Sequence, residues 1–271
     1  MLRLRRRPRD PEGRMSLGDH LRELRNRLLV SVVAVLLCAV VGWVYYEELF
    51  SFILEPIRNV RDARGDALVN LNFGSGITQP FAVQMRVAIF VGIVLGSPVW
   101  IWQLWAFLLP GLHRAERRTA LAFFAAAVPL FFAGCLLAAW SLPRTVAILL
   151  SFTPAGTANL QDAMGYLNFI LYFVVAFGVA FLMPVLLVGA NVLRILPAPV
   201  MLRGWRVAVL LILVFCALAT PDPSAWTMLA LAAPMVVLYF GAVGVSFLLE
   251  RRRRRREPDW LATPDDRASA L

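Results

Sequence analysis

The chain has 271 residues, of which 60% are hydrophobic and 16% are charged, and its mean hydropathy is +0.70. Soluble globular domains usually contain about 45–50% apolar and about 25% charged residues, so this composition excludes an ordinary water-soluble fold. A membrane-spanning helix needs about 20 apolar residues. Six such helices with their loops use most of the chain, and no separate soluble domain is expected.

The positive charge is concentrated at the two ends of the chain. The formal net charge is +10, and all 27 basic residues are arginines. Arginine clusters at residues 3–27 and 251–256 both adjoin apolar segments. We interpret them as determinants of membrane topology and as contacts for anionic lipids, rather than as a nucleic-acid surface.

Six apolar segments predict transmembrane helices, and the fifth is short. In chain order they cover approximately residues 28–45, 81–109, 119–142, 165–193, 205–219 and 225–249. Arginine-rich loops alternate with loops that hold few arginines, and the positive-inside rule places the arginine-rich side in the cytoplasm. The opposite loops are expected at residues 47–80, 143–164 and 220–224.

The predicted fold class is therefore an all-α membrane protein with about six transmembrane helices and cytoplasmic N- and C-termini. Residues 1–27 form a basic cytoplasmic tail with an amphipathic segment. Residues 28–249 form the membrane domain, and residues 250–271 form a basic cytoplasmic tail whose polar composition predicts disorder.

The predicted spans are almost free of ionisable residues. This disfavours a proton-coupled pump and a voltage sensor, because both need charges at membrane depth. Neither GxSxG nor HExxH occurs, so no catalytic residues are assigned and the chain is not expected to be an enzyme. The three cysteines lie singly in apolar runs, and no metal site or cofactor is predicted. A small-solute transporter or channel remains the alternative, although it would need more polar residues along a central path.

The first polar segment of interest precedes the first span. Leucines recur there at the spacing of one helical face: Leu17, Leu21, Leu24 and Leu28. His20, Glu23 and Arg27 share a second stripe by their spacing of three and four residues. One interpretation is an ordinary interfacial helix with internal ion pairs. The other is that Glu23 accepts a cationic ligand.

The second segment follows the second span. Trp100, Trp102 and Trp105 are typical of an aromatic belt at the membrane surface. A Pro-Gly pair then predicts the end of the helix. Beyond it, Glu116 stands in a loop with three arginines, where a lone acid usually forms a local ion pair.

These two segments together resemble the signatures of the TatC family, the multi-spanning receptors of the twin-arginine protein translocase. Residues 20–28, HLRELRNRL, resemble its HLxELRxRL signature. The second segment resembles its PxxxxQxWxFxxPGLxxxER signature through Pro98, Gln103, Trp105, Phe107, Pro110, Gly111, Glu116 and Arg117. Weaker elements of the family pattern are Pro56, Phe81, Phe177, Gly178 and Pro184. The resemblance covers residues 15–249, and residues 11–15 resemble the extended amino end of actinobacterial members.

The resemblance implies a function. Family members bind the signal peptides of folded cargo proteins and, with single-span partners of the TatA and TatB types, move that cargo using the proton-motive force. The resemblance implies a homo-oligomer within a hetero-oligomeric complex of the bacterial cell membrane, in contact with lipids. The implied acceptors for signal-peptide arginines are Glu23 and Glu116, in motifs that also contain His20, Arg22, Arg25 and Arg117.

The chain departs from the family pattern at two places. Leu182 stands where the family often has a membrane-buried Glu, two residues before the proline of the fourth span. Gln79 and Pro80 precede Phe81, where an acid is common, and Phe81 is expected to keep a packing role. Gln161, Asp162 or Asn168 could replace the missing Glu.

Overall fold

The computed structural model describes residues 17–64, 69–72, 76–108, 117–151, 159–219 and 225–254. Side chains are described for these residues except 17, 56–64, 69–71, 108, 117–120, 159–161, 225–227 and 254.

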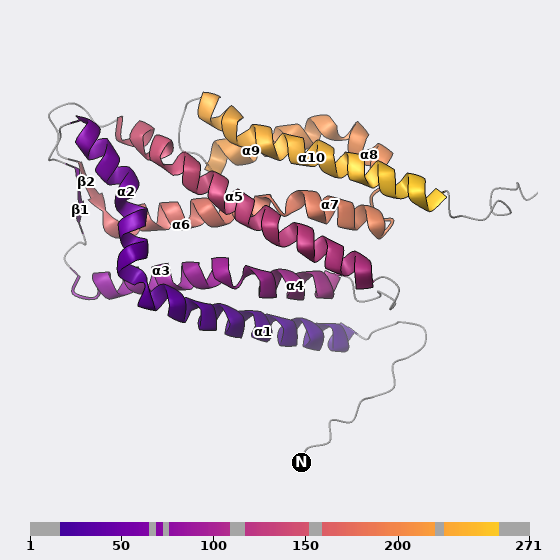
Figure 1. The fold of residues 1–271 in the computed structure, drawn as a ribbon, viewed down its shortest axis with the longest axis horizontal. Helices are drawn as coiled ribbons and strands as arrows, with labels where there is room; N and C mark the ends of the chain where they lie inside the picture. The colour runs from indigo at the N-terminus through magenta and orange to yellow at the C-terminus, as the bar shows by residue number, and fades with distance from the viewer. Residues whose placement is uncertain are drawn as a thin grey trace, which may run out of the picture. The chain divides into compact units, whose positions relative to one another are not determined.

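The described residues form ten helices and one pair of short strands (Figure 1). In chain order these are α1 Leu17–Val44, α2 Tyr46–Arg64, β1 Val69–Asn72, α3 Gln79–Leu95, α4 Ser97–Leu108, α5 Arg117–Ser151, β2 Asn159–Asp162, α6 Ala163–Ala180, α7 Met183–Val192, α8 Ala198–Arg203, α9 Trp205–Ala219 and α10 Ala225–Arg254. The strands pair in parallel, with Val69 opposite Asn159. This small sheet is the one departure from an all-α fold among the described residues.

Helices occupy all six predicted spans, and five of the six are long and apolar enough to cross a membrane if the bent α3–α4 pair counts as one span. Four helical stretches are long and apolar enough to span a membrane: Gly18–Val44, Leu121–Ser151, Ala163–Val192 and Met228–Arg253. The α3–α4 pair adds a fifth span with a bend of 56°. The sixth is α9, whose 15 residues rise only about 22 Å, less than the roughly 30 Å of a hydrocarbon core.

Several predicted boundaries were wrong. The predicted loop at residues 47–80 contains α2, an amphipathic helix that a search for long apolar runs overlooks. The predicted loop at residues 143–164 begins too early, because α5 continues through Pro143 to Ser151. Proline is tolerated inside membrane helices, since neighbouring groups and small backbone adjustments satisfy the freed carbonyl.

Two predicted spans are broken. The second divides at Gly96, and the fourth divides at Phe181 and Leu182. In each case a proline follows within three residues of the break, Pro98 and Pro184 respectively. Proline has no N–H to continue the helical ladder, and its ring crowds the preceding turn, so a bend or break at these positions has a direct steric cause.

The two ends of the membrane domain are also helical. The first helix begins at Leu17, so the predicted amphipathic segment forms the first turns of α1. The last helix continues from the sixth span to Arg254, into the arginine cluster. The divisions proposed at residues 27 and 250 therefore fall inside continuous helices.

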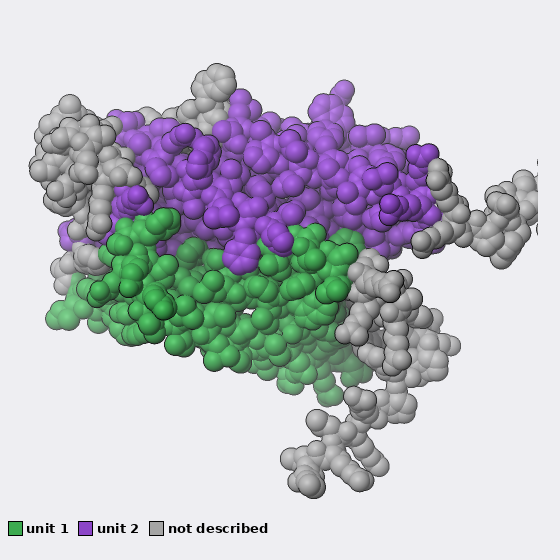
Figure 2. Space-filling view, viewed as in Figure 1, with its two compact units in different colours: residues 1–52, 75–128 green, residues 53–74, 129–271 purple. Residues whose placement is uncertain are grey.

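The chain divides into two compact units (Figure 2). Unit 1 comprises residues 1–52 and 75–128. In it α1 packs along α3 and α4. The helices approach closely at Gly92 of α3, where an added Cβ would lie 2.4 Å from the carbonyl oxygen of Val35. Small residues allow membrane helices to approach this closely. Close packing stabilises the helix pair through dispersion contacts, since the hydrophobic effect does not drive helices together inside lipid.

Unit 2 comprises residues 53–74 and 129–271. Its helices α5 and α6 meet at Gly134 and Gly178, and an added Cβ at Gly178 would lie 2.7 Å from Sγ of Cys135. Phe177 is fully buried at this contact. Helix α10 packs against α7, α8 and α9, and the Tyr239 hydroxyl donates to the carbonyl oxygen of Met201 at 2.6 Å.

Candidate functional site

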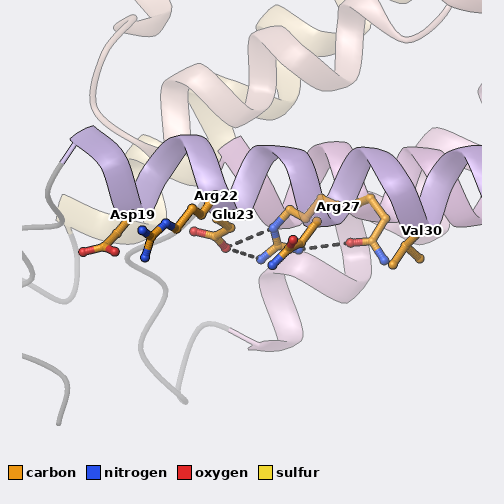
Figure 3. A pocket seen from close by; sticks show the side chains of 7 residues that line it. Asp19, Arg22, Glu23, Arg27 and Val30 are labelled. Carbon is orange, nitrogen blue, oxygen red and sulfur yellow. Dashed lines mark hydrogen bonds and ion pairs between the residues drawn. The ribbon is translucent and has the colours of Figure 1, made fainter. Parts of the chain in front are cut away.

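Unit 1 contains an open groove on the amino-terminal part of α1, with a volume of about 410 Å³ (Figure 3). Its lining residues are Asp19, Arg22, Glu23, Asn26, Arg27 and Val30 from α1 and Gln103 from α4. The α1 residues recur once per helical turn, at position 19, at 22 and 23, at 26 and 27, and at 30, so they lie on one face of the helix. The groove is therefore a polar face of α1 closed on one side by α4.

Glu23 forms an ion pair with Arg27 in this groove. Nε and Nη2 of Arg27 both donate to Oε1 of Glu23, at 3.0 and 2.5 Å. The two side chains are about one quarter exposed, 23% for Glu23 and 26% for Arg27. The predicted stripe on α1 thus places a carboxylate against a guanidinium, as the i, i+4 spacing indicated.

Gln103 extends this interaction to α4. Nη1 of Arg27 donates to Oε1 of Gln103 at 3.2 Å, across 76 positions of sequence. All three nitrogens of the Arg27 guanidinium are therefore bonded. The sequence indicated Gln103 as a motif residue, but it did not indicate that its partner is Arg27.

The second carboxylate oxygen of Glu23 is different. Oε2 is shielded from solvent and has no hydrogen-bond partner among the described residues. A buried carboxylate oxygen without a donor is destabilising, since it has lost its hydration. Because it is shielded, this oxygen could accept a hydrogen bond from a ligand only after the Glu23 side chain moves.

His20 joins the two helices at the same end of α1. Its ring stacks on Phe107 of α4, with centroids 4.5 Å apart and planes inclined by 21°. Trp105 is buried and stacks on Phe123 at 5.1 Å. The prediction of an interfacial belt is therefore wrong for Trp105, because this ring packs between helices instead of facing the membrane surface.

The remaining residues of the first motif differ in whether they line the groove. Arg22 lines the groove, whereas Arg25 is exposed and does not line it. Leu21 and Leu24 are 57% and 41% exposed, as expected for a face that lipid or another protein covers.

Part of the second motif lies outside the described residues. Glu116, Pro110 and Gly111 belong to residues 109–116, which the structure does not describe. Arg117 begins α5 and Pro56 lies within α2, but their side chains are outside the description as well. The structure therefore brings Glu23 and Gln103 to the same groove. That Glu116 acts beside Glu23 in binding a signal peptide stays a prediction.

The weaker motif residues occupy different environments. Pro184 is buried at the start of α7. Phe81 is 57% exposed and meets Trp43 edge-on at 5.9 Å. Leu182 is 6% exposed, so the position where the family often carries an acid is a packed apolar site in this chain. Asp162 caps α6 by accepting the N–H of Gly165 at 2.7 Å, which gives it a structural role.

A second polar cluster, in unit 2, was missed by the sequence analysis. Oε1 of Glu250 accepts from Nδ2 of Asn191 and from the backbone N–H of Ala198, both at 2.7 Å. Asn191 is 2% exposed, and its Nδ2 also donates to the carbonyl oxygen of Leu196 at 3.0 Å. Ala198 begins α8, whose first N–H groups lack partners within the helix, so a carboxylate from α10 caps it.

The groove is suited to binding a cationic group. Within the described ranges, no group of three or more His, Cys, Asp or Glu residues could hold a metal ion. The groove offers a carboxylate that already binds one guanidinium, which makes a cationic ligand rich in hydrogen-bond donors the natural counterpart.

Comparison with known proteins gives consistent matches over most of the chain. Residues 19–234 match the family described as Sec-independent protein translocase protein (TatC). A protein of that name from Xylanimonas cellulosilytica is 44% identical over 243 residues, covering 90% of this chain and 87% of the relative. One from Rothia mucilaginosa is 38% identical and covers 98% of this chain and 90% of the relative. A crystal structure of a twin-arginine translocase receptor, TatC, in the detergent DDM has a TM-score of 0.68 at 27% identity, covering 84% of this chain and 99% of that one.

Proposed function

The chain belongs to the TatC family of Sec-independent protein translocase proteins, and we propose that it captures cargo by accepting signal-peptide arginines on Glu23 and Glu116. The matches confirm the resemblance drawn from the two cytoplasmic motifs. The chain is the receptor subunit of the twin-arginine translocase in the bacterial cytoplasmic membrane, and it is not an enzyme.

The observation that supports this assignment is the carboxylate of Glu23, which holds a guanidinium in an open groove. Guanidinium presents its donors in a rigid planar fork that a carboxylate matches and that an ammonium does not. The same carboxylate is therefore suited to an arginine supplied by a peptide. Glu116 would accept the second arginine, as its place in the family motif implies.

These contacts supply specificity more than affinity. Exposed carboxylate–guanidinium pairs are worth only about 0–1 kcal/mol each. Two such pairs would leave a peptide at millimolar affinity or weaker, since about 4.1 kcal/mol corresponds to 1 mM. The apolar part of the signal peptide must therefore provide most of the binding energy, through contact with the receptor or the bilayer.

Membership of the family makes the chain a subunit of the translocase complex. We propose that its direct partners are single-span subunits of the TatA and TatB types and that it forms homo-oligomers within the complex. Folded cargo would cross using the proton-motive force, and anionic lipids would contact the arginine-rich ends.

Photo-cross-linking of a twin-arginine peptide to the chain in membranes tests the assignment. Glu23→Gln and Glu116→Gln should each reduce the yield of the adduct, by up to about five-fold for a contact worth up to about 1 kcal/mol, without lowering the amount of protein in the membrane. Glu47→Gln is the matched control, because Glu47 is an exposed carboxylate of unit 1 that does not line the groove. Normal cross-linking of the Glu23 and Glu116 double variant would refute the assignment of these acids.

A further inference from the structure

The ion pair in the groove has a consequence for how a ligand reaches Glu23. We propose that Arg27 is an internal competitor that occupies Glu23 until a signal-peptide arginine displaces it, and that it sets the affinity a peptide needs for capture. This inference rests on the proposed function, in which Glu23 accepts an arginine of the peptide.

The first argument is that Arg27 occupies one carboxylate oxygen. Nε and Nη2 of Arg27 both donate to Oε1 of Glu23, which fills both lone pairs of that oxygen. A guanidinium that binds a carboxylate in its preferred geometry uses both oxygens, one for each of two parallel bonds. A ligand arginine can adopt this geometry on Glu23 only after Arg27 has released Oε1.

The second argument is that the other oxygen is closed. Oε2 of Glu23 is shielded from solvent and has no donor among the described residues. With Oε1 occupied and Oε2 shielded, neither acceptor of Glu23 is available in this conformation. The carboxylate must rotate toward the groove before it can bind a ligand, and rotation breaks its bonds to Arg27.

The third argument is that Gln103 gives Arg27 an alternative partner. Nη1 of Arg27 already donates to Oε1 of Gln103 at 3.2 Å, and this bond does not involve Glu23. When the carboxylate turns away, Arg27 keeps a hydrogen-bond partner on α4. The groove thus contains both the resting partner of Arg27, Glu23, which Figure 3 labels beside it, and Gln103, the partner that would remain after exchange.

The charges around Glu23 fit an exchange. The groove is lined by two acids, Asp19 and Glu23, and by two arginines, Arg22 and Arg27, so it is neutral at rest. A peptide with two arginines enters without strong long-range attraction and gains from Glu23 only by replacing one guanidinium with another. An arginine of the peptide replaces the two hydrogen bonds of Arg27 with equivalent ones, so the exchange costs little free energy. A lysine replaces them with a single weaker contact.

The test uses the full-length chain in lipid nanodiscs and a fluorescent twin-arginine signal peptide. Arg27→Met should tighten binding by about 1.5- to 5-fold, the range expected when an ion pair that is about one quarter exposed no longer competes. Arg27→Lys keeps the charge but loses the planar set of guanidinium donors, so it should increase the peptide affinity less than Arg27→Met does. A twin-lysine peptide should gain by the same factor, because Arg27 opposes both peptides equally.

The control is Arg203→Met, which removes an exposed arginine outside the groove and should leave the dissociation constant unchanged. Unchanged or weaker binding by Arg27→Met would overturn the inference, since a residue that positions Glu23 for the ligand lowers affinity when removed. If Arg27→Met lowers the melting temperature, Arg27→Lys becomes the test variant. Unchanged or weaker peptide binding by Arg27→Lys would then overturn the inference.

Failure of the proposed function gives a different result. In that case the unmodified chain does not bind the peptide, or Glu23→Gln binds it normally. If Glu23→Gln loses binding and Arg27→Met binds no better than the unmodified chain, the receptor assignment stands and the competitor role of Arg27 is refuted.

Discussion

Replacing Gly92 with Ala should destabilise unit 1, although alanine is the better helix former. At this position the new Cβ would lie 2.4 Å from the carbonyl oxygen of Val35 and 3.0 Å from Cβ of Ala39. The first contact is with backbone, which cannot rotate away, so α1 and α3 must separate. Overpacking of this kind costs about 1–3 kcal/mol, which outweighs the roughly 0.5–1 kcal/mol gained from alanine in a helix.

The matched control is Gly244→Ala. Gly244 lies inside α10, and an added Cβ there would meet no heavy atom within 4 Å. This variant should gain the helical preference of alanine without the steric cost, so its thermal stability in detergent should equal or exceed that of the unmodified chain. The Gly92 variant should melt at a lower temperature.

Gly92→Ala should also disturb the groove lined by Glu23 and Arg27. Helix α1 carries Arg27 and helix α4, which follows α3, carries Gln103, so separation at Gly92 lengthens the bond between them. Loss of cargo export together with the lower melting temperature is expected. Equal melting temperatures for Gly92→Ala and Gly244→Ala would show that α1 and α3 do not pack as closely as described, and would refute the argument.

Two further predictions concern unit 2. Leu182→Glu should destabilise the chain by at least about 2 kcal/mol, because Leu182 is 6% exposed and an acid there has no described partner. Leu182→Met is the control. A normal melting temperature for the Glu variant would show that water reaches the site. Glu250→Ala should cost about 2–4 kcal/mol by removing the acceptor of Asn191 and Ala198, whereas Glu250→Gln, which keeps an acceptor oxygen, should cost less. Equal melting temperatures for the two Glu250 variants would contradict the capping role.

The predicted site shows where sequence reasoning reached its limit. Spacing on one helix placed Glu23 beside Arg27, because residues four apart share a helical face. Nothing in that spacing indicated Gln103, which lies 76 positions from Arg27. The cluster around Glu250 was missed for the same reason, since its partners Asn191 and Ala198 are 59 and 52 positions away.

The sequence by itself determined which segments enter the membrane and on which side their ends lie. Hydropathy and arginine placement are properties of local segments, and the boundaries of α9 at Trp205 and Ala219 match the prediction. Tertiary structure alone decided that Leu182 is packed and that Gln103 holds Arg27 in the groove. Such features depend on which helices meet, and helix pairing in a bilayer follows from close packing of small residues far apart in sequence, which no local pattern encodes.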